Sequence, residues 1–546
     1  MKQLLLALCL LVGVGAQAQP NGNLQWVQAF SDINAVMDVA TDVNGDVYLT
    51  GRVSGTLRLG STQLTAPGGL SLYVAKCRPS GEVVWATQLP SSALALGYRV
   101  QVDARGNSYV AGSFQGTLSY GRNQQITSQT PASGEAGFLL KCNAAGQVQW
   151  VQQISASGTE LYSTCSAWAV ALDVMGNAYL TGTASGSQVH IGNFTFANRQ
   201  RQTYLASYTP QGTVRWAHMW QSAADFGGNV GRAIALDNFG NCYVSGNHIG
   251  GMQLAGQSIP ANNSQSLFLA KFDTRRGQLQ WLQAPAAFGD GNSLAADRQG
   301  NVYLTGWFSG SRTFGNKTAT SHGGTDVAVV RYNRDGRVAW ATALGGPSDD
   351  YDGDLAVSPR TGKVFVSGIL NLSSEGTNQA FWVQLQPSGQ PMRPVLVGGP
   401  GTSSTGMLAL DARENVYMTG VFTGTCQFGN TTLQSTFTSG YLARYGHHDD
   451  RSTPPVAETP AAPIRACSVY PNPTREQFTL RLEGHTGPAA RAVLLNLVGR
   501  QVAEQTLLPA GAITETTFST AQLPVGMYIL RVEHGRQVLT HAVSVQ

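Results

Sequence analysis

The feature that most constrains this chain is a unit of about sixty residues that recurs seven times before residue 447. Each copy contains a turn, usually Asp-x-x-Gly-Asn, followed by a strand with Tyr or Phe and a closing Gly. The copies read DVNGDVYLTG ending at Gly51, DARGNSYVAG at Gly112, DVMGNAYLTG at Gly182, DNFGNCYVSG at Gly246, DRQGNVYLTG at Gly306, SPRTGKVFVSG at Gly368 and DARENVYMTG at Gly420. A fixed period of this size is typical of solenoids, arrays and propellers.

A second signature lies between the copies of the first. It consists of an apolar strand, a short turn and a strand with a tryptophan, and it recurs around Trp85, Trp150, Trp216, Trp281 and Trp340. The sixth copy has no tryptophan, and the seventh stops at Gly446 before its tryptophan strand. The missing strand lies at the other end of the chain, in NGNLQWVQAF with Trp26, so the repeats are circularly shifted.

This circular shift favours a closed ring over an open solenoid. An open solenoid needs atypical capping repeats at its ends. A ring has no ends, and building its last blade from both termini closes it and removes exposed sheet edges. The sequence therefore predicts an all-β fold: a seven-bladed β-propeller whose last blade takes its outermost strand from residues 23–30.

Side-chain size predicts the order of the four strands, A to D, in each blade. Strand A ends at the turn Asp, strand B carries the Tyr, strand C is the apolar run, and strand D carries the Trp. Small residues fit the crowded centre of a ring, and large aromatic residues fill the wider space outside. Two positions before the turn the residues are Ala40, Gln101, Ala171, Ala235, Ala295, Ala356 and Ala409. We therefore expect strand A to be innermost.

Composition divides the chain into four parts. Residues 1–18 read as a secretory leader, with Lys2, an apolar run, and Ala16-Gln17-Ala18 as the cleavage site. The propeller follows over residues 19–446, then a Pro-rich linker over 447–466, and a small β-sandwich over 467–546. After the leader no apolar run reaches the roughly twenty residues that a spanning helix needs. We therefore expect no transmembrane segment in the mature chain.

Charge and cysteine content narrow the classes of partner. Only 12% of the residues are charged and the formal net charge is +4, so net charge offers no support for nucleic-acid binding. The six cysteines beyond the leader are scattered, with no CxxC pair, and we interpret them as small core residues.

The repeat resembles the bacterial SBBP-type β-propeller repeat family. The residues that carry the resemblance include LGGPSDDYDGDLAVSPRTGKVFVSG over 344–368 and ALDVMGNAYLTG over 171–182. The resemblance implies the fold over residues 23–446 and no particular activity.

A further set of motif residues lies in the C-terminal region, at Tyr470, Pro471, Asn472, Pro473, Gly499, Arg500, Gly526 and Tyr528. Through these residues the region resembles a type A sorting domain of the type IX secretion system. The resemblance implies export by the type IX secretion machinery, followed by release or attachment at the outer cell surface.

The sequence contains few motifs that indicate catalysis or metal binding. The Asp-x-x-Gly-Asn turns could supply oxygen ligands for calcium, but they suit tight hairpin turns directly, so we predict no metal or cofactor site. HExxH, GxSxG and GxxxxGK are absent, and we assign no catalytic residue. Strand A offers Asp38, Arg99, Arg232 and Asp354 near the predicted channel, as an acid–base site or as salt bridges.

Loop length points to a binding face. The A to B and C to D turns are short, whereas the B to C and D to A connections are longer and varied. Strand parity places both long sets on one face, where binding residues commonly occur. The candidate binding residues are Asp32, Asp225, Phe226, Asp290, Trp307, Asp349, Asp350 and Tyr351; the alternative is that they are only solvated loop residues.

These observations support three hypotheses for function. The first is a secreted or surface-displayed binding or adhesion protein whose ligand is a glycan or a protein. The second is a secreted enzyme that acts on a polysaccharide or related polymer from the channel mouth. The third is a structural component of a surface layer.

Overall fold

The computed structural model describes residues 23–30, 36–66, 68–121, 123–130, 134–157, 163–197, 200–222, 228–260, 265–285, 293–371, 378–446, 464, 466–484, 490–496, 501–508, 513–534 and 537–546. The predicted leader lies outside these residues, as does most of the predicted linker. The chain divides into two compact units, Met1–Asp450 and Arg451–Gln546. The regular elements of the described residues are all strands, and none is a helix able to cross a membrane.

In the described part of the first unit, antiparallel strands follow one another in sets of four, paired in the order A, B, C, D, and these sets are called here the first to seventh sheets. The first four are β2 (Asp38–Thr41), β3 (Val47–Val53), β6 (Ser71–Cys77), β7 (Val83–Leu89); β8 (Leu94–Val102), β9 (Ser108–Gln115), β12 (Ala136–Cys142), β13 (Val148–Ser157); β14 (Thr164–Leu172), β15 (Ala178–Ser185), β18 (Gln202–Tyr208), β19 (Val214–Met219); and β21 (Gly228–Leu236), β22 (Asn241–Ile249), β25 (Ser266–Asp273), β26 (Leu279–Gln283). The last three are β27 (Leu294–Ala296), β28 (Val302–Phe314), β29 (Lys317–Tyr332), β30 (Val338–Leu344); β31 (Tyr351–Val357), β32 (Val364–Asn371), β33 (Asn378–Leu385), β34 (Val395–Gly398); and β35 (Thr402–Leu410), β36 (Val416–Phe428), β37 (Thr431–Gly446), β1 (Asn23–Phe30). Pairing of β16 (Gln188–Ile191) with β13 extends the second set to six strands, and pairing of β34 with β36 joins the sixth and seventh sets into one eight-stranded sheet.

The A strands form the centre of a ring. Each contacts the A strand of the next sheet, in the order β2, β8, β14, β21, β27, β31, β35 and back to β2. Together they line a central channel, and the small residues two positions before the turn, such as Ala171 and Ala295, face it. The aliphatic residues one position earlier, such as Val100 and Leu355, are buried in the core clusters. The fold is therefore all-β and propeller-like, with strand A innermost as predicted.

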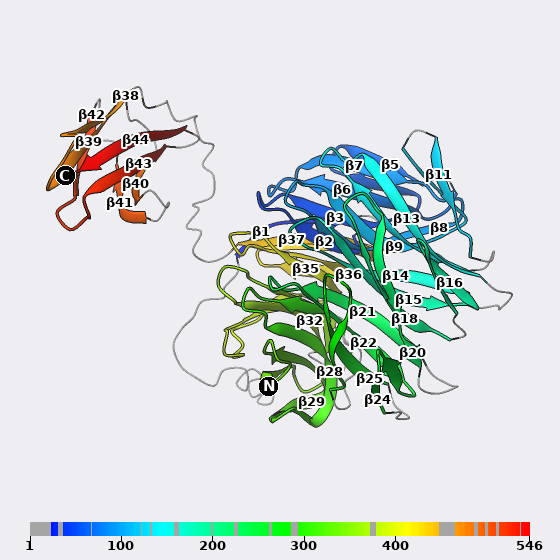
Figure 1. The fold of residues 1–546 in the computed structure, drawn as a ribbon. Coiled ribbons are helices and arrows are strands. Elements are labelled where there is room, and N and C mark those ends of the chain that lie inside the picture. The colour runs from blue at the N-terminus through cyan, green and yellow to red at the C-terminus, as the bar shows by residue number, and fades with distance from the viewer. Residues whose placement is uncertain are drawn as a thin grey trace. The chain divides into compact units, whose positions relative to one another are not determined.

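The N-terminal strand completes the seventh sheet. Along β1, Asn23 pairs with Gly446 and Phe30 pairs with Gly440, so the two ends of the first unit share one sheet. Figure 1 shows the blue β1 beside the yellow β37. The predicted pairing of residues 23–30 with the last C strand is confirmed.

In five of the sheets the repeated tryptophan joins the sheet to the next one. Its Nε1–H donates to a carbonyl in the C to D turn of the following sheet, while its ring packs near the Tyr of its own sheet. The donor–acceptor pairs are Trp26 to Pro79 at 2.9 Å, Trp85 to Ala144 at 3.0 Å, Trp150 to Pro210 at 3.1 Å, Trp216 to Thr274 at 3.3 Å and Trp340 to Pro387 at 3.0 Å. Trp281 packs near Tyr243 in the same way, but its Nε1 has no hydrogen-bond partner among the described residues. Trp26 makes this contact from the seventh sheet to the first and so closes the ring.

The sixth sheet lacks this tryptophan and is joined to the seventh by different contacts. Main-chain pairing of Val397 with Phe428 links β34 to β36. A second contact lies at the A to B turn of the seventh sheet. There Glu414 occupies a left-handed position (φ 65°) that glycine fills in the other A to B turns. Its buried carboxylate accepts hydrogen bonds from the hydroxyls of Ser358 and Thr361 in the sixth sheet's turn, where the repeat has lost its Asp. Two departures from the repeat therefore compensate each other across one interface.

The recurring Asp explains why the A to B turns of different sheets have the same form. In the first sheet Asp42 Oδ1 accepts the backbone N–H groups of Asn44 and Asp46 at 2.9 and 3.0 Å. Asp103, Asp173, Asp237, Asp297 and Asp411 make the same pair of bonds, and each also accepts from the side-chain amide of the Asn that follows the Gly or Glu. Both carboxylate oxygens thus stabilise the turn, as the turn interpretation predicted.

The long B to C connections differ from the expected loops. In the first four sheets they contain β-hairpins: β4 (Thr56–Leu59) with β5 (Thr62–Thr65), β10 (Thr117–Tyr120) with β11 (Gln124–Thr127), β16 (Gln188–Ile191) with β17 (Phe194–Ala197), and β23 (Met252–Leu254) with β24 (Gln257–Ile259). Several pair with the outer strand of the preceding sheet: β16 pairs with β13, and β23 pairs with the short β20 (Gln221–Ser222) that follows β19. These connections therefore hold neighbouring sheets together, and less of this face is free loop than we expected.

The second unit contains two antiparallel sheets around one apolar core. They are β38 (Ala466–Tyr470), β39 (Gln477–Glu483) and β42 (Ile513–Ser519), and β41 (Gln501–Leu507), β40 (Ala490–Asn496), β43 (Gly526–His534) and β44 (Gln537–Val545). The Asn472 side chain donates to the Ala542 carbonyl and accepts from Ser544 N–H, so the Tyr-Pro-Asn-Pro motif joins the end of β38 to β44. Tyr528 donates to the Pro524 carbonyl at 2.8 Å. Gly499 and Arg500 lie outside the described residues.

We expect Trp26→Ala to lower the free energy of unfolding of the first unit by roughly 2–3 kcal/mol, because the change removes an aromatic ring and a hydrogen bond at the closing interface. Denaturant unfolding followed by tryptophan fluorescence and circular dichroism measures the loss. Val84→Ala, an exposed position on the outer strand of the first sheet (47% exposed), is the control and should change little. Equal stability of Trp26→Ala and the native chain would contradict closure through this strand.

Candidate functional site

The structure describes half of the predicted binding residues. Asp32, Asp225, Phe226 and Asp290 lie outside the described residues. Trp307, Asp349, Asp350 and Tyr351 are described and gather where the fifth sheet meets the sixth. Trp307 lies in strand B of the fifth sheet, and the other three lie at or just before the start of strand A of the sixth. They come together because the D to A connection crosses from one sheet to its neighbour.

Two aromatic rings mark this site. The Trp307 and Tyr351 rings meet edge to face, with centroids 6.3 Å apart and planes at 79°. Tyr351 is 45% exposed, and Trp307 is partly exposed. Aromatic faces in contact with water cost free energy unless a partner covers them, and flat apolar ligand surfaces are suitable partners. The pair can therefore form one wall of a binding surface.

The two neighbouring carboxylates have different environments. Asp349 is exposed and accepts the Thr325 N–H at 2.8 Å. Asp350 is fully buried and accepts the N–H groups of Gly346 at 2.6 Å and Asn371 at 2.8 Å. Burial raises the pKa of Asp350 to about 6, which the charges of Asp326 and Asp349 also favour, although the two N–H groups oppose the shift. Asp350 therefore titrates near neutral pH, whereas Asp349 offers a free carboxylate edge to a ligand.

Sequence reasoning missed two further residues of this site, His322 and Asp326. His322 Nδ1 lies 2.8 Å from Asp326 Oδ2, with the imidazole half exposed and the carboxylate fully buried. Asp326 Oδ1 is buried without a hydrogen-bond partner. A Cβ placed on Gly345 would lie 2.7 Å from both Asp326 Oδ1 and Asp350 Oδ2, so the two carboxyl groups flank one point.

The reason for missing this pair is the geometry of the strand. His322 and Asp326 are four residues apart, a separation at which side chains meet on a helix but not on a regular extended strand. They meet here because β29 is distorted between its hairpin end and its core, where the ladder with β28 shifts between Ser309 and Ser311. The signal in the sequence is the stretch His322-Gly323-Gly324 ahead of the apolar run.

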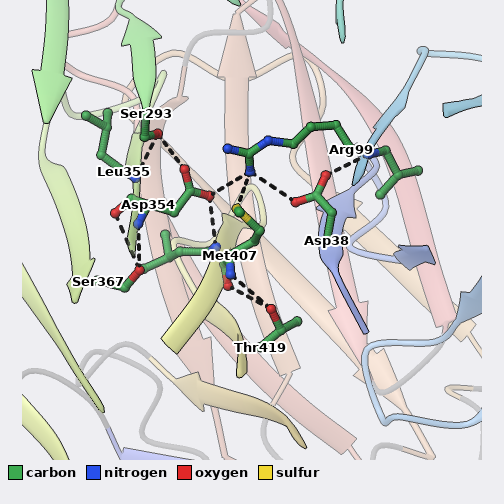
Figure 2. A network of polar contacts seen from close by, with 10 residues as sticks. Asp38, Arg99, Ser293, Asp354, Leu355, Ser367, Met407 and Thr419 are labelled. Atoms are coloured by element: carbon green, nitrogen blue, oxygen red, sulfur yellow. Dashed lines mark hydrogen bonds and ion pairs between the residues drawn. The ribbon is translucent and has the colours of Figure 1, made fainter. Parts of the chain in front are cut away.

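Three of the four charged residues predicted near the channel form a buried ion-pair network, one of the two alternatives that the sequence left open (Figure 2). Arg99 lies between two buried carboxylates, with Nη1 3.5 Å from Asp38 Oδ1 and 3.6 Å from Asp354 Oδ2. Asp38 also accepts the Val100 N–H of the second sheet at 2.6 Å. Asp354 accepts the Leu408 N–H of the seventh sheet at 3.0 Å.

The network continues around the channel, a cavity of about 390 Å³. The Ser293 hydroxyl of the fifth sheet donates to Asp354, and Arg99 also contacts Met407 Sδ of the seventh (Figure 2). These bonds connect five of the seven sheets through side chains that point inward. The carboxylates are thus already engaged in joining sheets, which favours the salt-bridge interpretation over an acid–base site.

Arg232, the fourth predicted channel residue, takes no part in these bonds. Its guanidinium lies 5.0 Å from the Trp168 ring centroid, and Trp168 stacks on Tyr98 with centroids 4.5 Å apart. All three occupy β-bulges of their A strands, where the ladder register shifts and the side chain is turned out of the regular alternation. Of the four residues, therefore, three converge and Arg232 lies apart.

Comparison with known proteins identifies the C-terminal part. Residues 468–546 match the model of the secretion system C-terminal sorting domain. This match shows that the chain carries a type IX sorting domain, which directs proteins out of the cell or onto its surface. The protein is therefore secreted or located at the cell surface.

The chain is also similar to other proteins at low sequence identity. An uncharacterized WD repeat-containing protein of Acanthamoeba polyphaga mimivirus is 20% identical over 76% of this chain and 37% of its own length. This chain thus spans little more than a third of that relative. Among solved structures, a polysaccharide lyase of family PL25, an ulvan lyase, is 12% identical (TM-score 0.39; 73% of this chain, 93% of that one). A Dyadobacter fermentans protein of unknown function has a TM-score of 0.35 at 12% identity (79% of this chain, 100% of that one).

The channel network predicts a pH dependence of stability. Burial raises the pKa of Asp38 to about 7, from 3.8 for the free side chain, although Arg99 and the Val100 N–H partly oppose the shift. The folded state then binds this proton more tightly than the unfolded state, so Asp38's contribution to stability is full below about pH 4 and is lost as pH rises through about 7.

We therefore expect Asp38→Asn to gain stability relative to the native chain as pH rises from 5 to 8, because the Asn cannot ionise. Denaturant unfolding of both chains at pH 5, 6, 7 and 8 measures the difference. A difference that stays constant over this range, or that changes in the opposite direction, would contradict the raised pKa of Asp38.

Proposed function

We propose that this chain is a secreted or surface-displayed binding protein, an SBBP-type seven-bladed β-propeller that binds a glycan or a protein where its fifth and sixth sheets meet. The observation that carries the proposal is the clustering of partly exposed Trp307 and exposed Tyr351 with the exposed Asp349 and the half-exposed His322, which the buried Asp326 and Asp350 support from below. A sugar ring offers an apolar face for stacking and hydroxyl groups for polar side chains, and this surface provides both kinds of partner.

The polar groups of this surface have spare hydrogen-bonding capacity. Asp349 accepts one N–H and is otherwise exposed, and the outer nitrogen of His322 is directed away from the Asp326 contact on a half-exposed ring. In the channel network, by contrast, the carboxylates already form hydrogen bonds and ion pairs with neighbouring sheets. This contrast supports binding at the sheet junction over catalysis from the channel mouth.

A glycan array probed with the labelled mature chain identifies ligands, and biolayer interferometry then measures the affinity of the variants. We expect Trp307→Ala and Tyr351→Ala each to weaken binding by about 2 kcal/mol, the cost of truncating a central contact aromatic. Phe437→Ala is the matched control, because Phe437 is an aromatic side chain that is 81% exposed on the seventh sheet. Unchanged affinity in both variants, or an equal loss in the control, would place the ligand elsewhere.

Export is tested by removing the sorting domain. Truncation after Gly446 should abolish release and surface display, because residues 468–546 carry the match to the sorting domain. The circular dichroism of the first unit should stay unchanged, since the chain divides into two compact units at residue 450. Cell fractionation and surface proteolysis measure the effect, and normal surface display of the truncated chain would refute the sorting role.

A further inference from the structure

The A to B and C to D turns of the first unit form one surface, called here the turn face. In each sheet the two turns lie together: a Cβ on Gly106 would contact Ala144, and one on Gly176 would contact Pro210. Turns of adjacent sheets also meet, since Arg334 lies over the Phe239 ring at 4.2 Å. The turn face is therefore a continuous surface around one end of the channel.

Exposed arginines are concentrated on the turn face. Among the described turn residues, the exposed acidic side chains are only Glu82 and Asp335, whereas the exposed arginines are Arg78, Arg105, Arg275, Arg276, Arg298, Arg334, Arg337, Arg360 and Arg413. Most of them form an arc from the C to D turn of the fourth sheet to the A to B turn of the seventh.

Several turn carboxylates interact with lysines of strand C rather than with these arginines. Lys76 of strand C lies 3.5 Å from Asp42, and Lys141 and Lys271 occupy the same place over Tyr109 and Tyr243 in their own sheets. Coulombic attraction from Asp103 acts on Lys141, and attraction from Asp237 acts on Lys271. Asp103 and Asp237 therefore do not depend on the exposed arginines for compensation of their charge.

Most of these arginines have no anionic partner. Arg78 pairs with Glu82 and Arg360 pairs with Glu414, but Arg105, Arg275, Arg276, Arg298, Arg337 and Arg413 form no ion pair with any described residue. A guanidinium presents a planar fork of donors that matches carboxylate, sulfate and phosphate groups. An arc of unpaired guanidinium groups favours an anion that extends over several sheets.

We propose that the turn face binds an anionic polysaccharide whose sulfate or carboxylate groups recur along the polymer. The repeat places arginines at successive positions around the arc, which suits a polymer with repeated charges better than a small anion. The sorting domain places the protein outside the cell, where such polymers occur and where nucleic acid is not the ordinary partner. This surface is distinct from the Trp307–Tyr351 site, and the proposal does not depend on that site.

Heparin, a sulfated polysaccharide, is the probe, and the mature full-length chain is the protein. Biolayer interferometry on immobilised heparin compares the double variant Arg298→Ala/Arg413→Ala with Arg58→Ala/Lys317→Ala, which removes the same charge from exposed positions in the B to C hairpins. We expect the first variant to bind about tenfold more weakly, the effect of losing two exposed ion pairs, and the second to bind almost as the native chain does. Both should keep the native thermal midpoint, because all four side chains are exposed.

Other outcomes overturn the proposal. Equal losses in the two variants would show attraction by total charge, and absence of heparin binding by the native chain would exclude the surface as a polyanion site. Duplex DNA of matched charge that binds as tightly as heparin would exclude selectivity for polysaccharide. Loss of heparin binding in Trp307→Ala with none in Arg298→Ala/Arg413→Ala would move the anionic ligand to the sheet junction; unchanged binding in Trp307→Ala leaves the two sites independent.

Discussion

The first unit depends on contacts between each sheet and the next. A four-stranded sheet with two apolar faces cannot be stable alone, and each sheet here buries both faces against its neighbours. The tryptophan of strand D fixes this arrangement, because its ring fills the wide outer part of the interface while its N–H finds a carbonyl in the following sheet. The contact made by Trp26 is chemically the same as the others, but it joins the two ends of the unit.

The interface between the sixth and seventh sheets shows what the tryptophan contact contributes. There the repeat loses its Trp and the turn Asp, and the chain compensates with main-chain pairing of β34 with β36 and with the buried carboxylate of Glu414. The hydroxyls of Ser358 and Thr361, with Lys363 and Arg360, hold the pKa of Glu414 below its usual value although burial opposes ionisation. At this interface, as at those with a tryptophan, a contact joins the outer strand of one sheet to the next sheet, and hydrogen bonds satisfy the carboxylate of the A to B turn.

The requirement for closure also decides where function can occur. Inward-facing charges are engaged in the network of Asp38, Arg99 and Asp354, and several B to C hairpins pair with preceding sheets. Two surfaces keep groups that the fold does not use. One is the junction of the fifth and sixth sheets with Trp307 and Tyr351, and the other is the turn face with its arginines.

The sequence by itself determined the repeat, the strand order, the pairing of β1 with β37 and the role of the turn Asp, because each of these follows from local spacing and side-chain size. It also indicated the sorting domain, through residues such as Asn472 that join the two sheets of the second unit. The tertiary structure alone decided that His322 meets Asp326, that Arg99 is shared by carboxylates from the first and sixth sheets, and that the hairpins pair across sheets. Such contacts depend on strand distortions and on which sheets face each other across the ring, and neither is encoded in the period of the repeat.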